Sequence, residues 1–194
     1  MKNTNQSLFG KYETIKDLGT GSSGSVTLVR HISMDQERAL KKVPKASAFA
    51  ESALSEARLL KSLEHPSIPR IFDFEEDDAF YYIVEEYIDG ETLDSFLLHQ
   101  QLISPGLFFN ICEQLCNVFI YLHTQISTPI IYRDLKPEHI IVCHNKLKLI
   151  DFGVSTYVTQ KGNNFNHYGN IEFSAPECFT EDTITPAADI YSLG

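Results

Sequence analysis

The residues of this chain that are best suited to chemistry begin with a glycine-rich turn. Gly19, Gly21 and Gly24 follow the spacing Gly-x-Gly-x-x-Gly. Glycine has no Cβ, so the backbone at these positions can approach a phosphate group closely. The same spacing occurs in dinucleotide-binding turns, where the third glycine opens a helix. Here residues 25–29 are rich in β-branched side chains, which is typical of a strand and favours a phosphate-binding loop between two strands.

Four further motifs follow the turn in a fixed order. They are Ala39-Leu40-Lys41, Tyr132-Arg133-Asp134-Leu135-Lys136-Pro137-Glu138-His139, Asp151-Phe152-Gly153 and Ala175-Pro176-Glu177. Any one could arise by chance, but the ordered set resembles the eukaryotic-type serine/threonine protein kinase family, in its bacterial-type form. The resemblance runs from about Tyr12 to Gly194. It implies an enzyme that transfers the γ-phosphoryl group of ATP directly, in line, to Ser or Thr hydroxyls of proteins.

The resemblance implies roles for four catalytic side chains. Lys41 is expected to contact the α- and β-phosphates and to be held by a helix carboxylate. Glu51 and Glu56 are the candidates, and Glu56 matches the family's helix register. Asp134 is expected to accept the proton of the substrate hydroxyl. Lys136 would neutralise charge on the moving phosphoryl group, and it points to Ser or Thr rather than Tyr as the acceptor.

The expected metal ligands are Asp151 and His139, with ATP and Mg²⁺, or Mn²⁺, as cofactors. The family has asparagine where this chain has His139. Magnesium prefers hard oxygen ligands, whereas imidazole suits manganese better. Three alternatives follow. His139 binds a metal with a weaker magnesium preference, or it hydrogen-bonds Asp134 while Asp151 holds a single metal. In the third, the chain has lost phosphoryl transfer and is a nucleotide-binding pseudokinase, or an inactive truncated kinase fragment, that acts as an interaction module.

The resemblance also outlines a nucleotide pocket. The residues expected to bind the cofactor are Leu18, Gly19, Gly21, Gly24, Val26, Ala39, Lys41, Glu86, Tyr87 and Ile141. Glu85 would guard the back of the adenine pocket, where the family usually has an apolar residue or Thr. A carboxylate there needs a partner or a raised pKa, and Lys41 is the natural candidate. A register error of one residue would instead turn Glu85 toward solvent.

Composition limits the partners and the compartment. The 194 residues carry a formal net charge of −10 and are 43% hydrophobic, which indicates a globular protein and argues against nucleic acid or an anionic membrane as the main partner. No signal peptide or membrane-spanning run is present in the sequence. The four cysteines are spaced neither as a disulfide framework nor as a zinc site. A reduced, cytoplasmic location is therefore expected.

The hydrophobic pattern predicts a β-rich part followed by a helical part, and the family resemblance implies an α+β, bilobal, protein-kinase-like fold. Strands are predicted over 12–18, 25–30, 37–43, 68–74 and 80–87, helices over 47–63, 93–99 and 104–123, and a hairpin over 140–150. The apolar stripe of the longest helix, with Cys112 and Cys116, is predicted to be core. The predicted domains are an N-terminal extension (1–11), an N-lobe with an antiparallel sheet and one helix (12–85), a hinge (86–90) and a mainly helical, incomplete C-lobe (91–194).

The activation segment is expected over residues 151–177. Because Arg133 precedes Asp134, control by a phosphorylated residue is expected, with Ser155, Thr156 and Thr159 as candidates; ordinary loop hydroxyls are the alternative. Asp189 would brace the backbone around Arg133. The last residues resemble the start of the family's central large-lobe helix, so the chain is expected to be a C-terminally truncated catalytic domain.

Overall fold

A computed structural model describes residues 7–21, 24–99, 102–158, 171–180 and 184–194. The chain divides into two compact units. Unit 1 comprises residues 1–64 and 69–88, and unit 2 comprises residues 65–68 and 89–194. Unit 1 is mainly sheet and unit 2 is rich in helix, so the expected α+β class is confirmed.

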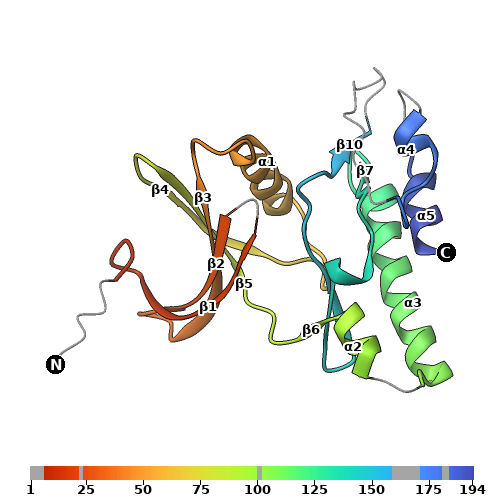
Figure 1. Cartoon of the computed structure of the whole chain (residues 1–194), viewed down its shortest axis with the longest axis horizontal. Coiled ribbons are helices and arrows are strands. Elements are labelled where there is room, and N and C mark those ends of the chain that lie inside the picture. The colour runs from red at the N-terminus through yellow and green to blue at the C-terminus, as the bar shows by residue number, and fades with distance from the viewer. Residues whose placement is uncertain (1–6, 22–23, 100–101, 159–170, 181–183) are drawn as a thin grey trace. The chain divides into compact units, whose positions relative to one another are not determined.

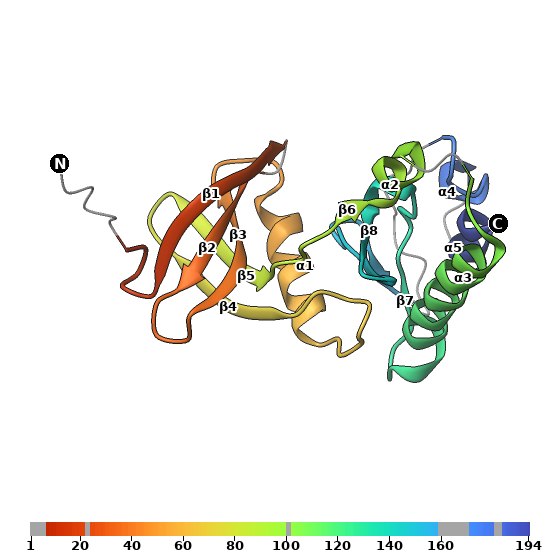
Figure 2. The same ribbon diagram turned by 90° about the horizontal axis from the view of Figure 1, so that it is seen from below.

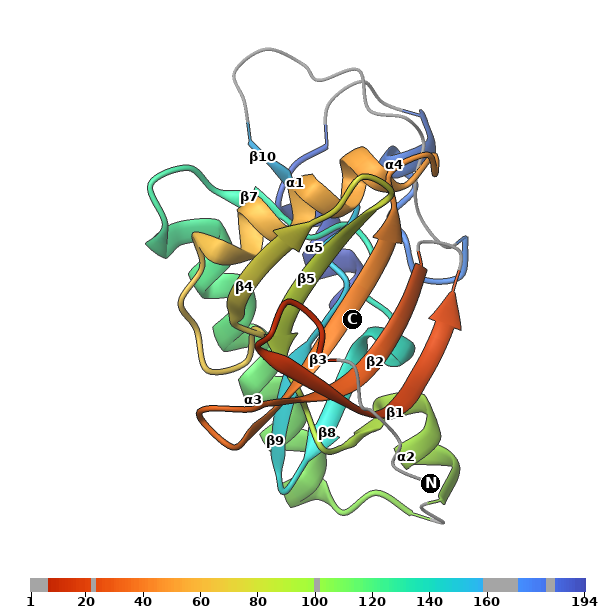
Figure 3. The same ribbon diagram turned by 90° about the vertical axis from the view of Figure 1, so that its left-hand side faces the viewer.

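Unit 1 is built on an antiparallel sheet with the order β1-β2-β3-β5-β4, which Figure 3 shows from β4 on the left to β1 on the right. Its strands are β1 (Tyr12–Gly21), β2 (Gly24–His31), β3 (Gln36–Pro44), β4 (Ile71–Glu76) and β5 (Phe80–Glu86). Strands that are consecutive in the chain pair with each other, except β3 and β4. The helix α1 (Ala50–Lys61) lies between those two strands in the chain, and β3 pairs with β5 instead. The predicted strands and helix of this part are all present.

The sheet of unit 1 buries apolar side chains on both faces. One face packs Val43 and Ile83 against Ala53 and Ala57 of α1, and Figure 2 shows α1 along that face. The other face carries a separate cluster of Tyr12, Val29, Leu40, Tyr82 and Val84. The alternation along β3 and β5 therefore serves two cores, which fixes the strand register.

Two element boundaries differ from the prediction. The helix expected over 47–63 begins at Ala50, because the Ser47 N–H donates to Pro44 O in a preceding turn and Phe49 is the N-cap. The strand expected from residue 68 begins at Ile71. Ile68 is instead buried within unit 2, where its carbonyl accepts from Lys148 Nζ over 3.3 Å.

Unit 2 contains the remaining elements (Figure 1). Its helices are α2 (Leu93–His99), α3 (Pro105–Ile120), α4 (Glu177–Thr180) and α5 (Ala187–Leu193), with a π-helical turn η1 (Tyr121–Gln125) and a 3₁₀ turn η2 (Pro137–His139). Strands β6 (Glu91–Thr92), β8 (Ile140–Cys143) and β9 (Lys146–Leu149) form one small sheet, and β7 (Ile130–Ile131) pairs with β10 (Thr156–Tyr157). The predicted hairpin turns at His144 and Asn145, which both have positive φ, as in a type I′ turn.

The long helix α3 starts as the sequence predicts but is less buried. Ser104 caps it by accepting from Leu107 N over 3.2 Å, with Pro105 in the first turn, a common helix start. Cys116 is exposed and Phe108 is 53% exposed, so the prediction that the whole stripe is core was wrong. The buried side is confined to the C-terminal half of α3 and to η1. Within the described segments, no helix combines the length and apolarity needed to span a membrane.

Candidate active site

The glycine turn joins β1 to β2 with two kinds of glycine. Around Gly19 and Gly21 an added Cβ would meet nothing within 4 Å. Gly24 differs, because its φ is +143° and a Cβ there would lie 2.1 Å from the carbonyl oxygen of Lys42 on β3. Leu18 lies where the β1–β2 register shifts. The first two glycines leave open space that a ligand could use, whereas the third is required by the sheet.

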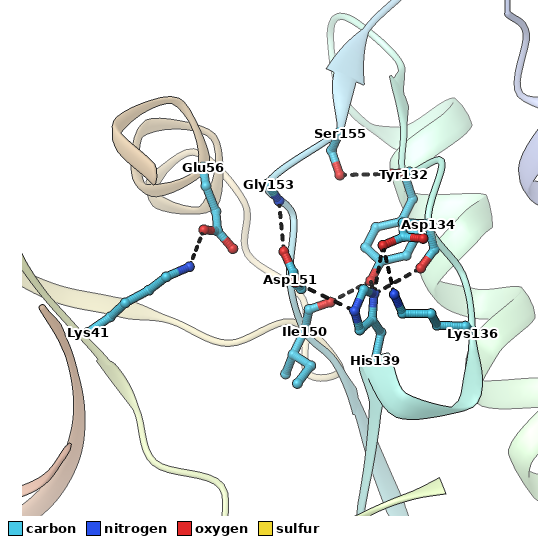
Figure 4. Close-up of polar contacts among 10 residues, drawn as sticks. All are labelled: Lys41, Glu56, Tyr132, Asp134, Lys136, His139, Ile150, Asp151, Gly153 and Ser155. Atoms are coloured by element: carbon cyan, nitrogen blue, oxygen red, sulfur yellow. Dashed lines mark hydrogen bonds and ion pairs between the residues drawn. The ribbon is translucent and has the colours of Figure 1, made fainter. Parts of the chain in front are cut away.

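Lys41 and Glu56 form an ion pair inside unit 1. Lys41 on β3 donates from Nζ to Glu56 Oε2 on α1 over 2.7 Å, as Figure 4 shows. The exposed fractions of the two side chains are 17% and 8%, so solvent screens this pair less than a surface pair. Glu51, the other candidate, is exposed in the first turn of α1. The structure therefore pairs Lys41 with the carboxylate that the helix register favoured.

Asp134 and Lys136 lie in the loop between β7 and η2 in unit 2. Lys136 Nζ donates to Asp134 Oδ2 over 3.3 Å. The preceding residue, Arg133, is buried and has φ of +75°, a conformation that is costly for a non-glycine residue. Asp189 of α5 compensates, because its carboxylate accepts from the N–H groups of Tyr132 and Arg133, each over 2.8 Å. The expected bracing role of Asp189 is thus confirmed.

His139 ends η2 and lies between two carboxylates (Figure 4). Its Nδ1 is 3.4 Å from Asp134 Oδ2, and its Nε2 is 3.5 Å from Asp151 Oδ2. The ring also lies near the backbone carbonyl of Asp134, 3.0 Å from Nδ1. One imidazole therefore bridges the residue expected to be the base and the residue expected to hold the metal. The contact with Asp134 is the one that the second alternative expected, whereas metal binding by His139 or Asp151 stays a prediction.

Asp151 follows β9 and is held in an exposed, strained conformation. Its φ is +62°, and its side chain is 54% exposed. Asp151 Oδ1 accepts from the Gly153 N–H over 3.3 Å, so the DFG turn itself directs one carboxylate oxygen. The other oxygen faces His139.

Aromatic side chains pack next to the cluster of Asp134, His139 and Asp151. The Tyr132 ring is fully buried and meets the Phe152 ring edge-on, with centroids 5.0 Å apart. The Tyr132 hydroxyl donates to Ile150 O, one residue before Asp151. Tyr132 therefore packs beneath the cluster, and its hydroxyl adds a polar link that the sequence did not indicate.

The residues present suit a metal only as part of a larger ligand set. Among the described residues, no group of three or more His, Cys, Asp or Glu side chains could hold a metal ion. Asp151 offers an exposed carboxylate, and His139 offers a nitrogen beside it. Magnesium is commonly bound through one or two carboxylates together with substrate phosphates and waters. The site fits a metal that arrives with a nucleotide.

The other residues expected to bind the cofactor divide between the two units. Val26 faces Lys41 across β2 and β3, and Ala39 faces Glu85 across β3 and β5. Glu86 ends β5, and Tyr87 follows it in unit 1. Ile141 lies on β8 in unit 2. In unit 1, Val26 and Ala39 are therefore on strands next to the β3 and β5 residues of the expected pocket, and Glu86 and Tyr87 are consecutive in the chain.

His123 was missed by the sequence analysis. Its Nε2 lies 2.8 Å from Asp189 Oδ2, and Asp189 is fully buried. The π-helical turn η1 carries His123, and such turns have no reliable sequence signal, although they are frequent at functional sites. His123 is therefore a supporting residue behind the Arg133 backbone.

The expected phosphorylation sites are only partly described. The Ser155 hydroxyl donates to Tyr132 O over 3.2 Å, and Thr156 pairs with Ile131 in the β7–β10 ladder. Thr159 lies outside the described residues. The Arg133 side chain donates from Nη1 to Val154 O over 3.4 Å. Regulation through Arg133 remains a prediction.

Comparison with known proteins identifies the family. Residues 12–194 match the family model described as the protein kinase domain, so the chain belongs to that family, as its motifs indicated. It is 31% identical over 192 residues to the serine/threonine-protein kinase PrkC of Bacillus subtilis, covering 95% of this chain and 29% of that protein. It is 32% identical over 191 residues to the serine/threonine-protein kinase ppk25 of Schizosaccharomyces pombe, covering 95% and 44% respectively. The chain thus spans less than half the length of these relatives.

Proposed function

We propose that the chain is an active protein kinase domain that transfers the γ-phosphoryl group of ATP to Ser or Thr hydroxyls of proteins. Membership of the protein kinase family and relatives named serine/threonine-protein kinases support the proposal. The observation that carries it is the cluster of Asp134, Lys136, His139 and Asp151 within one unit. Together with the Lys41–Glu56 pair, this supplies a base, two cations and a metal ligand.

In the proposed mechanism Asp134 accepts the proton of the acceptor hydroxyl. Its carboxylate is oriented by Lys136 and His139, so it starts in a defined position. Lys136 also places a positive charge beside the phosphoryl group that is being transferred. Stabilising the negative charge of the transition state is the main source of rate acceleration in such reactions. Because attack is direct, the acceptor oxygen gains the phosphoryl group as ADP leaves, and no covalent enzyme intermediate forms.

Lys41 in unit 1 binds the α- and β-phosphates, and Glu56 holds its ammonium in place. The β1–β2 glycine turn offers backbone N–H groups near open space at Gly19 and Gly21, which suits close approach of phosphate. Glu86 and Tyr87 offer backbone groups to adenine at the proposed hinge, residues 86–90, between an N-lobe (12–85) and a C-lobe (91–194).

Asp151, with His139, holds the divalent metal in this proposal. A bound metal neutralises phosphate charge and orients the terminal phosphate. The imidazole of His139 favours manganese over magnesium as the preferred ion. The proposed acceptors are proteins, with neither nucleic acid nor membrane as the main partner, and the proposed compartment is the cytoplasm.

The test of the proposed function is Asp134→Asn. We expect it to abolish transfer of labelled phosphate from ATP, to the chain itself or to a generic protein substrate, while ATP affinity stays within about twofold, since Asp134 acts on the acceptor hydroxyl. ATP affinity is measured by calorimetry. The matched control is Glu138→Gln, which removes a neighbouring carboxylate outside the cluster. Transfer retained by Asp134→Asn would remove Asp134 from the role.

A second candidate function is a nucleotide-binding pseudokinase. The observation that favours it is the His139 ring between Asp134 and Asp151, because it occupies the place where the family uses an asparagine amide. ATP binding with no transfer under either magnesium or manganese, in the parent chain and in His139→Asn alike, would support this candidate.

A further inference from the structure

Lys41 and Glu85 lie on the face of the unit 1 sheet that packs against α1. Lys41 pairs with Ile83 across β3 and β5, and Ala39 pairs with Glu85. Side chains that are directly opposite share a face of a sheet, and alternate residues along a strand do as well. Glu85 is therefore on the same face as Lys41, one step away on the diagonal, and Glu56 reaches this face from α1.

The residues directly opposite Glu85 on this face are apolar. Its direct neighbours are Ala39 on β3 and Ile71 on β4, and Ile83 precedes it on the same face with 2% of its surface exposed. A carboxylate in such a setting needs a cationic or hydrogen-bonding partner. Of the two positions diagonal to Glu85 on β3, Glu37 and Lys41, only Lys41 is basic.

The Lys41 ammonium can serve two carboxylates. A lysine has three donor hydrogens, and the hydrogen bond to Glu56 Oε2 at 2.7 Å uses one of them. Diagonal neighbours in an antiparallel sheet have backbones about 7–8 Å apart, within reach of two long side chains. We propose that Glu85 is a second acceptor for Lys41 and that the two glutamates share its ammonium. Glu85 is then a positioning residue for the proposed nucleotide site.

The sharing has a consequence for nucleotide affinity, which rests on the proposed role of Lys41 as a phosphate ligand. One ammonium facing two carboxylates leaves the group with a net negative charge. Phosphates that approach Lys41 must compete with Glu85 for the ammonium and are repelled by its charge. At an effective dielectric constant of about 40, between the values for a protein surface and for water, a unit charge about 7 Å away changes binding by roughly tenfold. Glu85 therefore weakens the binding of ATP in particular.

The first experiment measures ATP and adenosine dissociation constants of the full chain by calorimetry. We expect Glu85→Gln to bind ATP about tenfold more tightly and to bind adenosine as the parent does, because adenosine carries no phosphate. Glu85→Asp keeps the charge and should restore weak ATP binding. The control, Glu76→Gln, removes a carboxylate that pairs with Lys45 at 2.8 Å, and should leave both constants unchanged. Equal tightening for ATP and adenosine would overturn the proposal.

The second experiment needs no nucleotide. Glu56→Gln is compared in the parent and in the Glu85→Gln background by urea unfolding of the full chain. If Lys41 is shared, Glu56→Gln costs more stability in the Glu85→Gln background, because no carboxylate then remains beside the Lys41 ammonium. Additive costs would overturn the sharing. If no variant binds ATP, the proposed function fails, yet this cycle still decides whether Glu85 and Glu56 share Lys41.

Discussion

At the scale of single residues, the site depends on a few side chains held in unusual positions. Arg133 and Asp151 both have positive φ, and each is stabilised by specific partners, Asp189 for the first and Gly153 for the second. His139 then fills the space between two carboxylates. Strain of this kind is retained where the surrounding structure over-determines it.

The bridging position of His139 leads to a prediction about metal choice. The parent chain should transfer phosphate severalfold better with manganese relative to magnesium, and His139→Asn should reverse this ratio, because an amide oxygen is a harder ligand than an imidazole nitrogen. Initial rates of phosphate transfer with each metal measure the ratio. The control is His144→Asn on the β8–β9 turn, outside the cluster. An unchanged manganese-to-magnesium ratio in His139→Asn would contradict metal binding by His139.

His65 gives a prediction about acid stability. Burial, and then the positive charge of Lys148, lower the pKa of His65 from its usual value of 6.5. Its Nδ1 accepts from the Ser67 N–H over 3.1 Å, which requires the neutral ring. The unfolded chain takes up this proton more readily than the folded chain. Neutral His65 therefore contributes its full share to the free energy of unfolding above about pH 6.5. This share is lost as the pH falls through the lowered pKa of the folded chain.

Urea unfolding at a series of pH values between about 7.5 and 5 measures this effect. His65→Asn should flatten the decline in unfolding free energy at the acid end of that range, since its amide oxygen can accept from Ser67 without titrating. The exposed His144 serves as the control through His144→Asn, which should leave the slope as in the parent. A His65→Asn profile as steep as the parent's would rule the effect out.

At the scale of elements, much of the architecture was predictable and its boundaries were less so. The strands of unit 1, the Ser104 cap and the β8–β9 turn follow from local patterns in the sequence. The start of β4 does not, because Ile68 is apolar like a strand residue yet belongs to unit 2. The exposure of Cys116 and the π-helical turn that carries His123 also depend on tertiary packing, which helical periodicity cannot report.

The candidate site was likewise predictable where it depends on local sequence patterns and not where it depends on tertiary packing. The pairing of Lys41 with Glu56 rather than Glu51 could be predicted, because helix register determines which carboxylate faces the sheet. The double contact of His139 could not, since it depends on how η2 and the turn after β9 meet in space. The role of His123 behind Asp189 was hidden for a similar reason.

The β1–β2 turn allows a matched pair of substitutions. Gly24→Ala should lower the unfolding free energy by about 1–3 kcal/mol, because its Cβ would overlap a backbone oxygen of β3. Gly21→Ala should change stability by less than about 0.5 kcal/mol, since nothing lies near its Cβ. Urea unfolding of both variants measures the difference. Equal stability of the two would contradict this account of Gly24.

At the scale of the whole molecule, the described core clusters each belong to a single unit. Two lie on the faces of the unit 1 sheet, and a third joins Ile131 and Ala175 with Cys178, Ile184 and Ala188 in unit 2. Burial raises the pKa of the Cys178 thiol, in keeping with a closed core. Separate cores favour local opening of one unit without the other.

Val84→Ala tests this separation. Val84 is fully buried in unit 1, and its truncation should cost on the order of 1–3 kcal/mol. Hydrogen exchange followed by mass spectrometry should then speed up in β1 to β5 while α3 exchanges as in the parent. The reciprocal control, Val118→Ala in α3, should do the opposite. Uniform acceleration throughout the chain would mean that the two units open together.

The contact between Gly24 and the Lys42 carbonyl has a consequence for how the glycine motif evolves and can be engineered. The three glycines look equivalent in the sequence, yet their surroundings differ. Gly19 and Gly21 border open space, whereas Gly24 packs against the backbone of β3. If the turn binds phosphate as proposed, variation at Gly19 or Gly21 changes ligand preference and leaves the sheet intact. A side chain at Gly24 would disrupt the contact between β2 and β3 before it could alter ligand binding. Changes in ligand specificity are therefore open to only two of the three glycine positions.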